Sequence, residues 1–270
     1  MGAGIAHALL LAGSDVVLAE RDSGAAQVAR GRVDRAVRAS VERGKAEDAE
    51  QVLSHIELAT SIDALKGSDL VIEAVPEDLE LKVTTLRAVE AVVADDAVIA
   101  TNTSSISLDS LGQALRRPEQ LLGLHFFNPV PASKLIEVVV AERTDAELGD
   151  TAARWVRQLG KTPVVVRNAP GFASSRLGVA LGLEAIRMVE DGVASAQDID
   201  TAMTLGYGHP TGPLRLTDLV GLDVRLDIAR YLERELGPRF NPPGLLVDLV
   251  ERGDLGRKTG RGFYDWSDET

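Results

Sequence analysis

The chain has 270 residues, a length that allows one large domain or two smaller ones. Its net charge of −12 argues against a nucleic-acid or anionic-membrane partner, and the absence of cysteine excludes disulfides, thiolate metal sites and a cysteine nucleophile. The four histidines lack the spacing of a helical metal site, so no metal is expected. The sequence has no basic leader and no apolar run near the ~20 residues of a membrane span, which indicates a cytoplasmic protein.

Strand and helix patterns alternate over the first 168 residues. Short apolar and β-branched runs predict strands at 15–20, 56–59, 70–74, 98–101, 136–140 and 162–166. Helical spacing of apolar residues predicts helices at 25–43, 79–93 and 146–159. This order is typical of an α/β fold, here a Rossmann-like parallel sheet with helices on both faces.

The strand pattern ends at Asn168, and Pro170-Gly171 indicates a domain boundary. Helices are predicted beyond it at 172–190, 196–203, 214–236 and 245–252. We therefore expect a Rossmann domain at 1–168 and an all-α domain at 169–270.

The most informative segment is Gly-Leu-His-Phe-Phe-Asn-Pro-Val-Pro at 123–131. His125 follows an apolar run and Glu137 lies at the start of another, so both are expected at strand ends, where active sites of α/β proteins gather. An imidazole held by a carboxylate suits a general base. The alternative is a buried histidine that is simply hydrogen-bonded.

The chain opens with Met-Gly-Ala-Gly-Ile-Ala, which is typical of a Rossmann unit entered partway through. Gly2 would be the last fingerprint glycine, at the start of the helix that faces a pyrophosphate, and Glu20 would bind ribose hydroxyls. The first strand and the first two glycines are expected to be missing. Alternatively, the small residues only allow the helix to pack closely on a sheet.

Motifs along the whole chain identify a family. They are Glu-Ala-Val-Pro-Glu-Asp at 73–78, Asn-Thr-Ser-Ser at 102–105, the 123–131 segment, Lys-Leu-Ile-Glu-Val at 134–138, Pro-Gly-Phe at 170–172, Asp-Ile-Asp at 198–200, Gly-Pro at 212–213 and Gly-Arg-Lys-Thr-Gly-Arg-Gly-Phe-Tyr at 256–264. With these motifs in order and at matching spacing, the chain resembles the 3-hydroxyacyl-CoA dehydrogenases, and most of all the short, two-domain 3-hydroxybutyryl-CoA dehydrogenases of bacteria.

The resemblance implies NAD-dependent oxidation of an L-3-hydroxyacyl-CoA to a 3-oxoacyl-CoA. His125 would be the general base and Glu137 would orient its ring. Ser104 and Asn128 would line the pocket shared by substrate and nicotinamide, although both residues also suit turns and helix caps.

Further residues match family positions near the ligands. Glu77, Lys82 and Lys258 would approach the cofactor, although on residue type alone they suit a solvated helix start and tail. Glu20 favours NAD over NADP, because a carboxylate there repels a 2′-phosphate. Arg43, with Arg32, Arg35 and Arg38 in a basic stripe, would bind coenzyme A phosphates unless the stripe is only a solvated helix face.

Ser175 departs from the family, because many relatives carry asparagine at this substrate-contacting position. Two other functions stay open: a 3-hydroxyadipyl-CoA dehydrogenase, which needs a cation at the distal end of the acyl pocket, and a non-catalytic acyl-CoA-binding relative with impaired cofactor binding. The helical domain is expected to form a homodimer.

Overall fold

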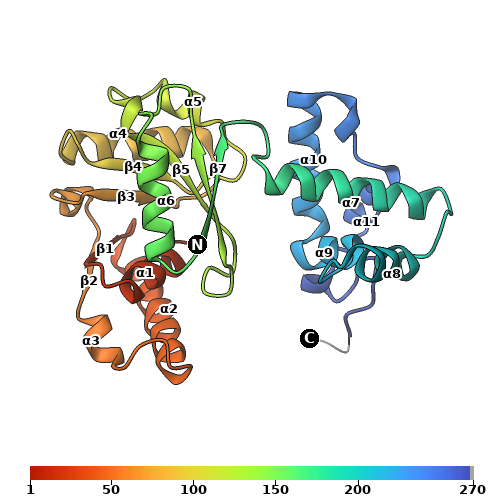
Figure 1. Ribbon diagram of the computed structural model, residues 1–270, viewed down its shortest axis with the longest axis horizontal. Coiled ribbons are helices and arrows are strands. Elements are labelled where there is room, and N and C mark those ends of the chain that lie inside the picture. The colour runs from red at the N-terminus through yellow and green to blue at the C-terminus, as the bar shows by residue number, and fades with distance from the viewer. Residues whose placement is uncertain (268–270) are drawn as a thin grey trace. The chain divides into compact units, whose positions relative to one another are not determined.

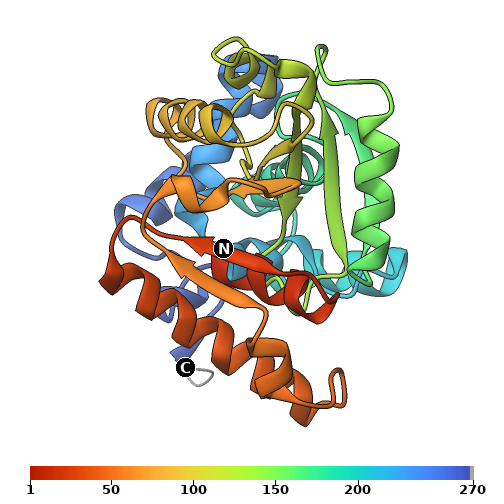
Figure 2. The same cartoon turned by 90° about the vertical axis from the view of Figure 1, so that its left-hand side faces the viewer.

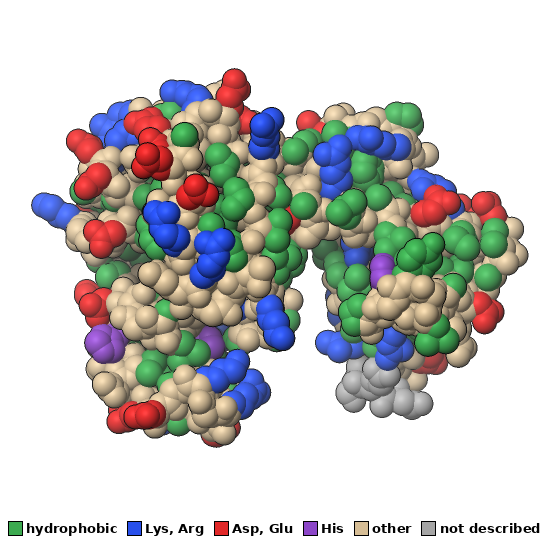
Figure 3. All heavy atoms as spheres, viewed as in Figure 1, with side chains coloured by type: hydrophobic (Ala, Val, Ile, Leu, Met, Phe, Trp, Pro, Cys, Tyr) green, Lys and Arg blue, Asp and Glu red, His purple; other side chains and the backbone are tan. Residues whose placement is uncertain are grey.

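The computed structural model describes residues 1–267, and the chain divides into two compact units, Met1–Ala169 and Pro170–Thr270 (Figure 1). The first unit contains strands and helices, and the second is helical. Acidic and basic side chains are spread over both units on the face shown in Figure 3. No helix within residues 1–267 is long and apolar enough to cross a membrane.

The first unit contains seven strands. They are β1 (Val16–Ala19), β2 (Ile56–Ala59), β3 (Leu70–Glu73), β4 (Val98–Thr101), β5 (Leu121–Phe126), β6 (Leu135–Val140) and β7 (Thr162–Arg167). Its α-helices are α1 (Gly2–Leu11), α2 (Ser23–Glu42), α3 (Ala49–Leu53), α4 (Leu79–Val92), α5 (Leu108–Gly112) and α6 (Leu148–Gln158). The predicted strands are all present within one or two residues of their expected bounds, and β5 contains the apolar run that was expected to end in a strand at His125.

The strands form two sheets. β1 pairs in parallel with β2, and the second sheet has the order β3-β4-β5-β6-β7. All neighbours in the larger sheet are parallel except β5 and β6, which are antiparallel. The sheet is therefore mainly parallel, as predicted, with one antiparallel pair that the strand and helix pattern did not indicate. The reason is the short connection at 127–134, which is too short for a parallel crossover.

Local sequence signals fix the main helices. Asp22, Asp48 and Asp78 each accept a hydrogen bond from a backbone N–H in the first turn of α2, α3 and α4, respectively.

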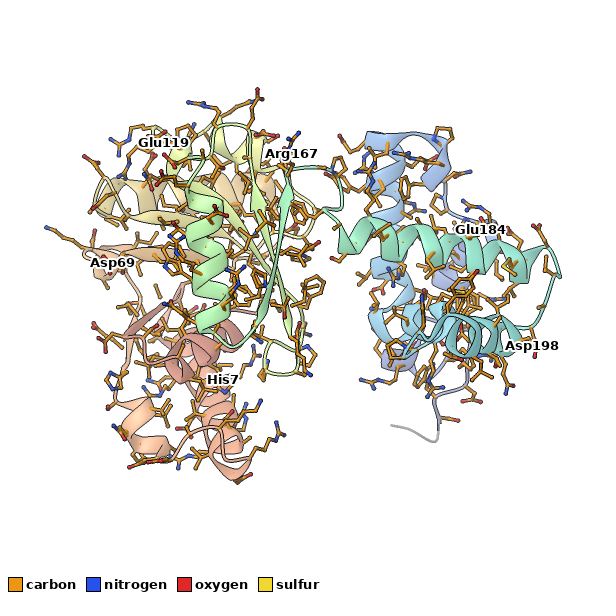
Figure 4. The ribbon with its side chains drawn as sticks, in the orientation of Figure 1. His7, Asp69, Glu119, Arg167, Glu184 and Asp198 are labelled. Carbon is orange, nitrogen blue, oxygen red and sulfur yellow. The ribbon has the colours of Figure 1, made fainter. Side chains whose placement is uncertain are left out.

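His7 on α1 is buried, and its Nε2 lies 2.9 Å from Oγ of Ser40 on α2 (Figure 4). Burial and two nearby lysines lower the pKa of His7, so this histidine is neutral at pH 7 and joins α1 to α2.

A cleft of about 1910 Å³ lies beside β1 and β3. It is lined by both strands together with α1 and the end of α6, and most of the lining side chains are apolar. β1 pairs only with β2, and β3 pairs only with β4, so each strand has one edge without a strand partner in the described chain. Figure 2 shows the β1–β2 pair set apart from the larger sheet.

The helical unit contains α7 (Ser174–Glu190), α8 (Ala196–Tyr207), α9 (Pro213–Val220), α10 (Leu222–Leu236) and α11 (Gly244–Glu251). The single helix predicted at 214–236 is wrong, because it is divided in two at Gly221. This residue has φ of 104°, a conformation that favours glycine and interrupts a helix. Buried leucines of α7, α9, α10 and α11 form the core of the unit.

We expect that fusing an extended apolar segment of about five residues and a glycine-containing turn ahead of Met1 raises Tm by several degrees. The segment would pair with the open edges of β1 and β3 and cover apolar walls of the cleft. Thermal unfolding followed by circular dichroism measures the change.

The control for this fusion carries proline at alternate positions of the same segment, because proline cannot donate ladder hydrogen bonds. An equal Tm for the two fusions and the parent chain would show that the cleft does not accept a strand.

Candidate active site

His125 and Glu137 lie directly opposite each other on the antiparallel strands β5 and β6. Nδ1 of His125 is 2.8 Å from Oε2 of Glu137, and both residues are buried, Glu137 completely. His125 lies near the end of its strand, as expected, because only Phe126 follows it in β5. The expectation of a strand end is wrong for Glu137, which is the third of six residues in β6. In an antiparallel pair, opposite residues project on the same face, so the pairing itself brings imidazole and carboxylate together.

This pair has the geometry of a general base and its orienting group. A carboxylate at Nδ1 fixes the ring orientation and stabilises the imidazolium that forms when the ring takes up a proton. The ring of Phe127 lies 4.6 Å from the imidazole, centroid to centroid, which adds an apolar neighbour.

Asn102 joins the histidine strand to the loop after β4. Its Oδ1 accepts a hydrogen bond of 2.8 Å from the backbone N–H of Phe126, the residue after His125. Ser104 lies two residues beyond Asn102. The hydrogen bond of Asn102 therefore joins the loop that carries Ser104 to the strand that carries His125. Asn102 has no predicted role, although its place directly after a buried strand, within the Asn-Thr-Ser-Ser motif, is a signal that indicates one.

Glu77 organises the loop that carries Ser104. Its Oε1 accepts hydrogen bonds from Thr103 Oγ1 at 2.6 Å, from the backbone N–H of Ser104 at 3.0 Å and from that of Ser105 at 2.9 Å. Burial opposes ionisation of Glu77, but these donors and the Lys82 ammonium outweigh it and lower the pKa. The charged carboxylate therefore holds the loop at neutral pH.

Lys82 is buried beneath this loop, with 1% of its side chain exposed. Its Nζ lies 2.8 Å from Glu73 Oε1 and 3.4 Å from Glu77 Oε2. Glu73 Oε2 also accepts a hydrogen bond from Thr101 Oγ1 at 2.6 Å. Glu73 and Lys82 thus form a buried ion pair, and the exposed Glu77 carboxylate is a second acid beside the same ammonium. The predicted contact of Glu77 and Lys82 with the cofactor stays a prediction.

The predicted nucleotide residues Gly2 and Glu20 both line the cleft beside β1. Gly2 begins the ten-residue helix α1, and Glu20 directly follows β1. Val75 and Pro76, just beyond β3, line the same cleft. The carboxyl ends of β1 and β3 and the amino end of α1 therefore open onto one cavity, as a dinucleotide site requires.

The remaining predicted residues belong to other segments of the chain. Asn128 is exposed at the end of β5 and precedes a cis peptide bond to Pro129. Arg43 is exposed at the end of α2. Ser175 belongs to α7 of the helical unit. In another part of the same unit, Lys258 Nζ binds the Asp223 carboxylate. Their ligand contacts stay predictions.

Comparison with known proteins decides the family. Residues 1–169 match the model of the 3-hydroxyacyl-CoA dehydrogenase NAD binding domain, and residues 171–266 match that of the 3-hydroxyacyl-CoA dehydrogenase C-terminal domain. The chain belongs to the 3-hydroxyacyl-CoA dehydrogenase family. It is therefore an NAD-dependent dehydrogenase, which confirms the resemblance, the fold class and the cofactor predicted from the sequence.

Individual 3-hydroxyacyl-CoA dehydrogenases align over nearly the whole chain. The 3-hydroxybutyryl-CoA dehydrogenase of Clostridioides difficile is 39% identical over 270 residues, which cover 99% of this chain and 96% of that protein. The mitochondrial hydroxyacyl-coenzyme A dehydrogenase of Sus scrofa is 37% identical, covering 98% and 88%. The crystal structure of (S)-3-hydroxybutyryl-CoA dehydrogenase from Ralstonia eutropha is 38% identical, covers 98% and 95%, and has a TM-score of 0.94.

Glu77→Gln is expected to lower Tm by roughly 2–4 °C at pH 7, because the loop loses a charged acceptor. The folded pKa lies below the ordinary 4.5, so the stabilisation is fully present above that value and is lost as the pH falls through the lower folded pKa. Melting curves from pH 8 to 3.5 should show a constant deficit that shrinks below about pH 4.5.

Glu80→Gln is the matched control, since Glu80 is exposed in the first turn of the same helix. A pH-independent deficit in Glu77→Gln, or the same deficit in the control, would contradict this role for the Glu77 charge.

Proposed function

We propose that this dehydrogenase oxidises a short L-3-hydroxyacyl-CoA, such as 3-hydroxybutyryl-CoA, to the 3-oxoacyl-CoA with His125 as general base. The observation that carries the mechanism is the buried His125–Glu137 pair with a 2.8 Å contact at Nδ1. With Nδ1 held by the carboxylate, Nε2 is the atom that takes the proton of the 3-hydroxyl. Glu137 then faces a charged imidazolium, which lowers the free energy of the state in which the proton has moved.

The cleft beside β1 fits the cofactor of the family. Gly2 presents a helix amino end suited to a pyrophosphate, and the Glu20 carboxylate suits ribose hydroxyls. When bound, NAD accepts the hydride that leaves C3 of the substrate. Glu77 would hold the Ser104 loop in place while the substrate is oriented.

Substrate contacts are assigned to Ser104 and Asn128 near the reacting oxygen, to Ser175 in the helical unit and to Arg43 for coenzyme A phosphates. Ser104 Oγ can donate to the 3-oxygen as its charge changes.

We further propose that the first unit is the NAD-binding domain and that the helical unit serves substrate binding and homodimerisation. Exposed leucines on the helical unit, among them Leu177 and Leu205, support an interface there. A cytoplasmic location stays a prediction.

His125→Gln is expected to lower kcat about 10²–10⁴-fold, because glutamine cannot accept the proton. Binding of NADH and acetoacetyl-CoA should change little, since the base acts in the chemical step. Steady-state kinetics with acetoacetyl-CoA and NADH, together with NADH fluorescence titration, measure both effects.

Glu137→Gln is the second variant, and its loss of kcat is compared with that of His125→Gln. It keeps a hydrogen-bond acceptor beside the ring but loses the charge. Its loss of kcat should be smaller than that of His125→Gln. A His125→Gln enzyme with a third of the parent turnover would refute the proposed base, and acyl-CoA binding with no turnover by the parent protein would favour the non-catalytic alternative.

Glu20→Ser is expected to shift the NADH-to-NADPH preference by about tenfold toward NADPH, or about 1.4 kcal/mol. The physical reason is removal of the carboxylate that repels a 2′-phosphate. The ratio of kcat/KM values for the two cofactors gives the shift. Glu42→Ser, at the exposed end of α2, is a control of equal charge change, and an equal shift in both variants would contradict the role of Glu20.

A further inference from the structure

Lys161 binds the loop at 127–134, which connects β5 to β6. Its Nζ donates hydrogen bonds to the backbone carbonyls of Val130 and Ser133, the first at 2.7 Å. A hydrogen bond from a charged ammonium is stronger than one from a neutral donor. A single side chain therefore holds two points of this loop.

The loop forms a turn between these two points. The N–H groups of Ala132 and Ser133 both donate to the Pro129 carbonyl, at 3.0 and 3.1 Å. This turn places the carbonyls of Val130 and Ser133 beside the same ammonium. The conformation of the turn and the contacts of Lys161 therefore depend on each other.

The backbone of Lys161 is fixed at the junction of α6 and β7. Gly160, with φ of 69°, follows the end of α6, and the N–H of Lys161 donates to the Val156 carbonyl at 3.1 Å. The next residue, Thr162, begins β7 and donates its N–H to the Lys134 carbonyl at 2.7 Å. Lys161 therefore reaches the loop from a rigid support.

The Lys161 ammonium has only backbone acceptors in the described chain. Within residues 1–267, it forms no ion pair with a carboxylate. Burial and the nearby Lys45 ammonium lower the pKa of Lys161. The charged form therefore depends on the two loop carbonyls, and loss of the charge is expected to release the loop.

The loop contacts segments of both proposed ligand sites in the first unit. It begins one residue after His125 and Phe126 end β5, and it contains Asn128, the proposed substrate contact. Val130 is 2% exposed, and a Cβ added at Gly4 of α1 would be only 3.0 Å from its Cβ. A shift of the loop would therefore move Asn128 and loosen the packing against the helix proposed to face the cofactor.

We propose that Lys161 is a positioning residue of this dehydrogenase and that its ammonium holds the 127–134 loop so that Asn128 contacts the substrate. The inference rests on the proposed function and adds a residue that acts through Asn128, not on the reacting atoms. Orientation of the bound substrate contributes to the rate, and a misplacement of about 1 Å can cost about 10²-fold.

Lys161→Met keeps an unbranched side chain of similar length without the charge or the donors. It is expected to lower kcat/KM for acetoacetyl-CoA about 10–100-fold, mostly through a higher KM, because the Asn128 contact is loosened. The Kd of NADH should change less than about threefold, since α1 keeps its packing on α2 and β1. Steady-state kinetics and NADH fluorescence titration measure these effects.

Two matched variants separate the charge of Lys161 from its bulk and its location. Arginine keeps a charge and several N–H donors, so Lys161→Arg should retain at least about a third of the parent kcat/KM. Lys134 is an exposed lysine of the same loop, and Lys134→Met should keep kcat/KM within about twofold of the parent.

Hydrogen exchange measures the order of the loop without turnover. The amides of Ala132 and Ser133 should exchange about tenfold faster in Lys161→Met, because the turn that they close loses its support. In Lys134→Met they should exchange at the parent rate. Melting curves of all three variants show whether a lost activity comes from unfolding.

An unchanged kcat/KM in Lys161→Met, or an equal loss in Lys134→Met, would overturn the inference while the proposed function stands. Parent exchange rates in the turn of Lys161→Met would also overturn it, as would a loss in Lys161→Arg as large as that in Lys161→Met. Failure of the parent to turn over acetoacetyl-CoA would instead overturn the proposed function, and hydrogen exchange would still test whether Lys161 holds the loop.

Discussion

The antiparallel pairing of β5 with β6 is the constraint on which the proposed catalytic site depends. It places His125 opposite Glu137 on one face of the sheet, where both side chains are buried and each satisfies the other. A slip of one residue in the register would turn one side chain to the opposite face and leave a buried carboxylate without its partner. The short connection between the two strands permits only an antiparallel return, and the apolar faces that both strands bury specify the register.

Buried carboxylates organise the loops of both units. In the first unit, Glu73 and Lys82 support Glu77, which holds the loop of Ser104. In the helical unit, Asp218 accepts hydrogen bonds from the backbone N–H groups of Phe263 and Tyr264 and from Trp266 Nε1. Burial raises the pKa of Asp218 although these donors oppose the shift. A Cβ at 256 or 262 would collide with Asp218, which explains both glycines of the closing motif.

The proposed cofactor site depends on a place where the fold leaves polar and charged groups facing open space. The cleft beside β1 has a helix amino end and the Glu20 carboxylate in its lining, and most of its other lining side chains are apolar. Such sites favour ligands of opposite charge, because the attraction is stronger where water is excluded.

The sequence by itself determined the element order, the family and the identity of the proposed catalytic pair, because apolar periodicity and short motifs are local properties of the chain. It did not determine that β5 and β6 run antiparallel or that Gly221 divides a helix, since register and φ depend on packing. The role of Asn102 became visible only in the tertiary structure. A hydrogen bond between residues 24 positions apart exists only once distant segments are brought together.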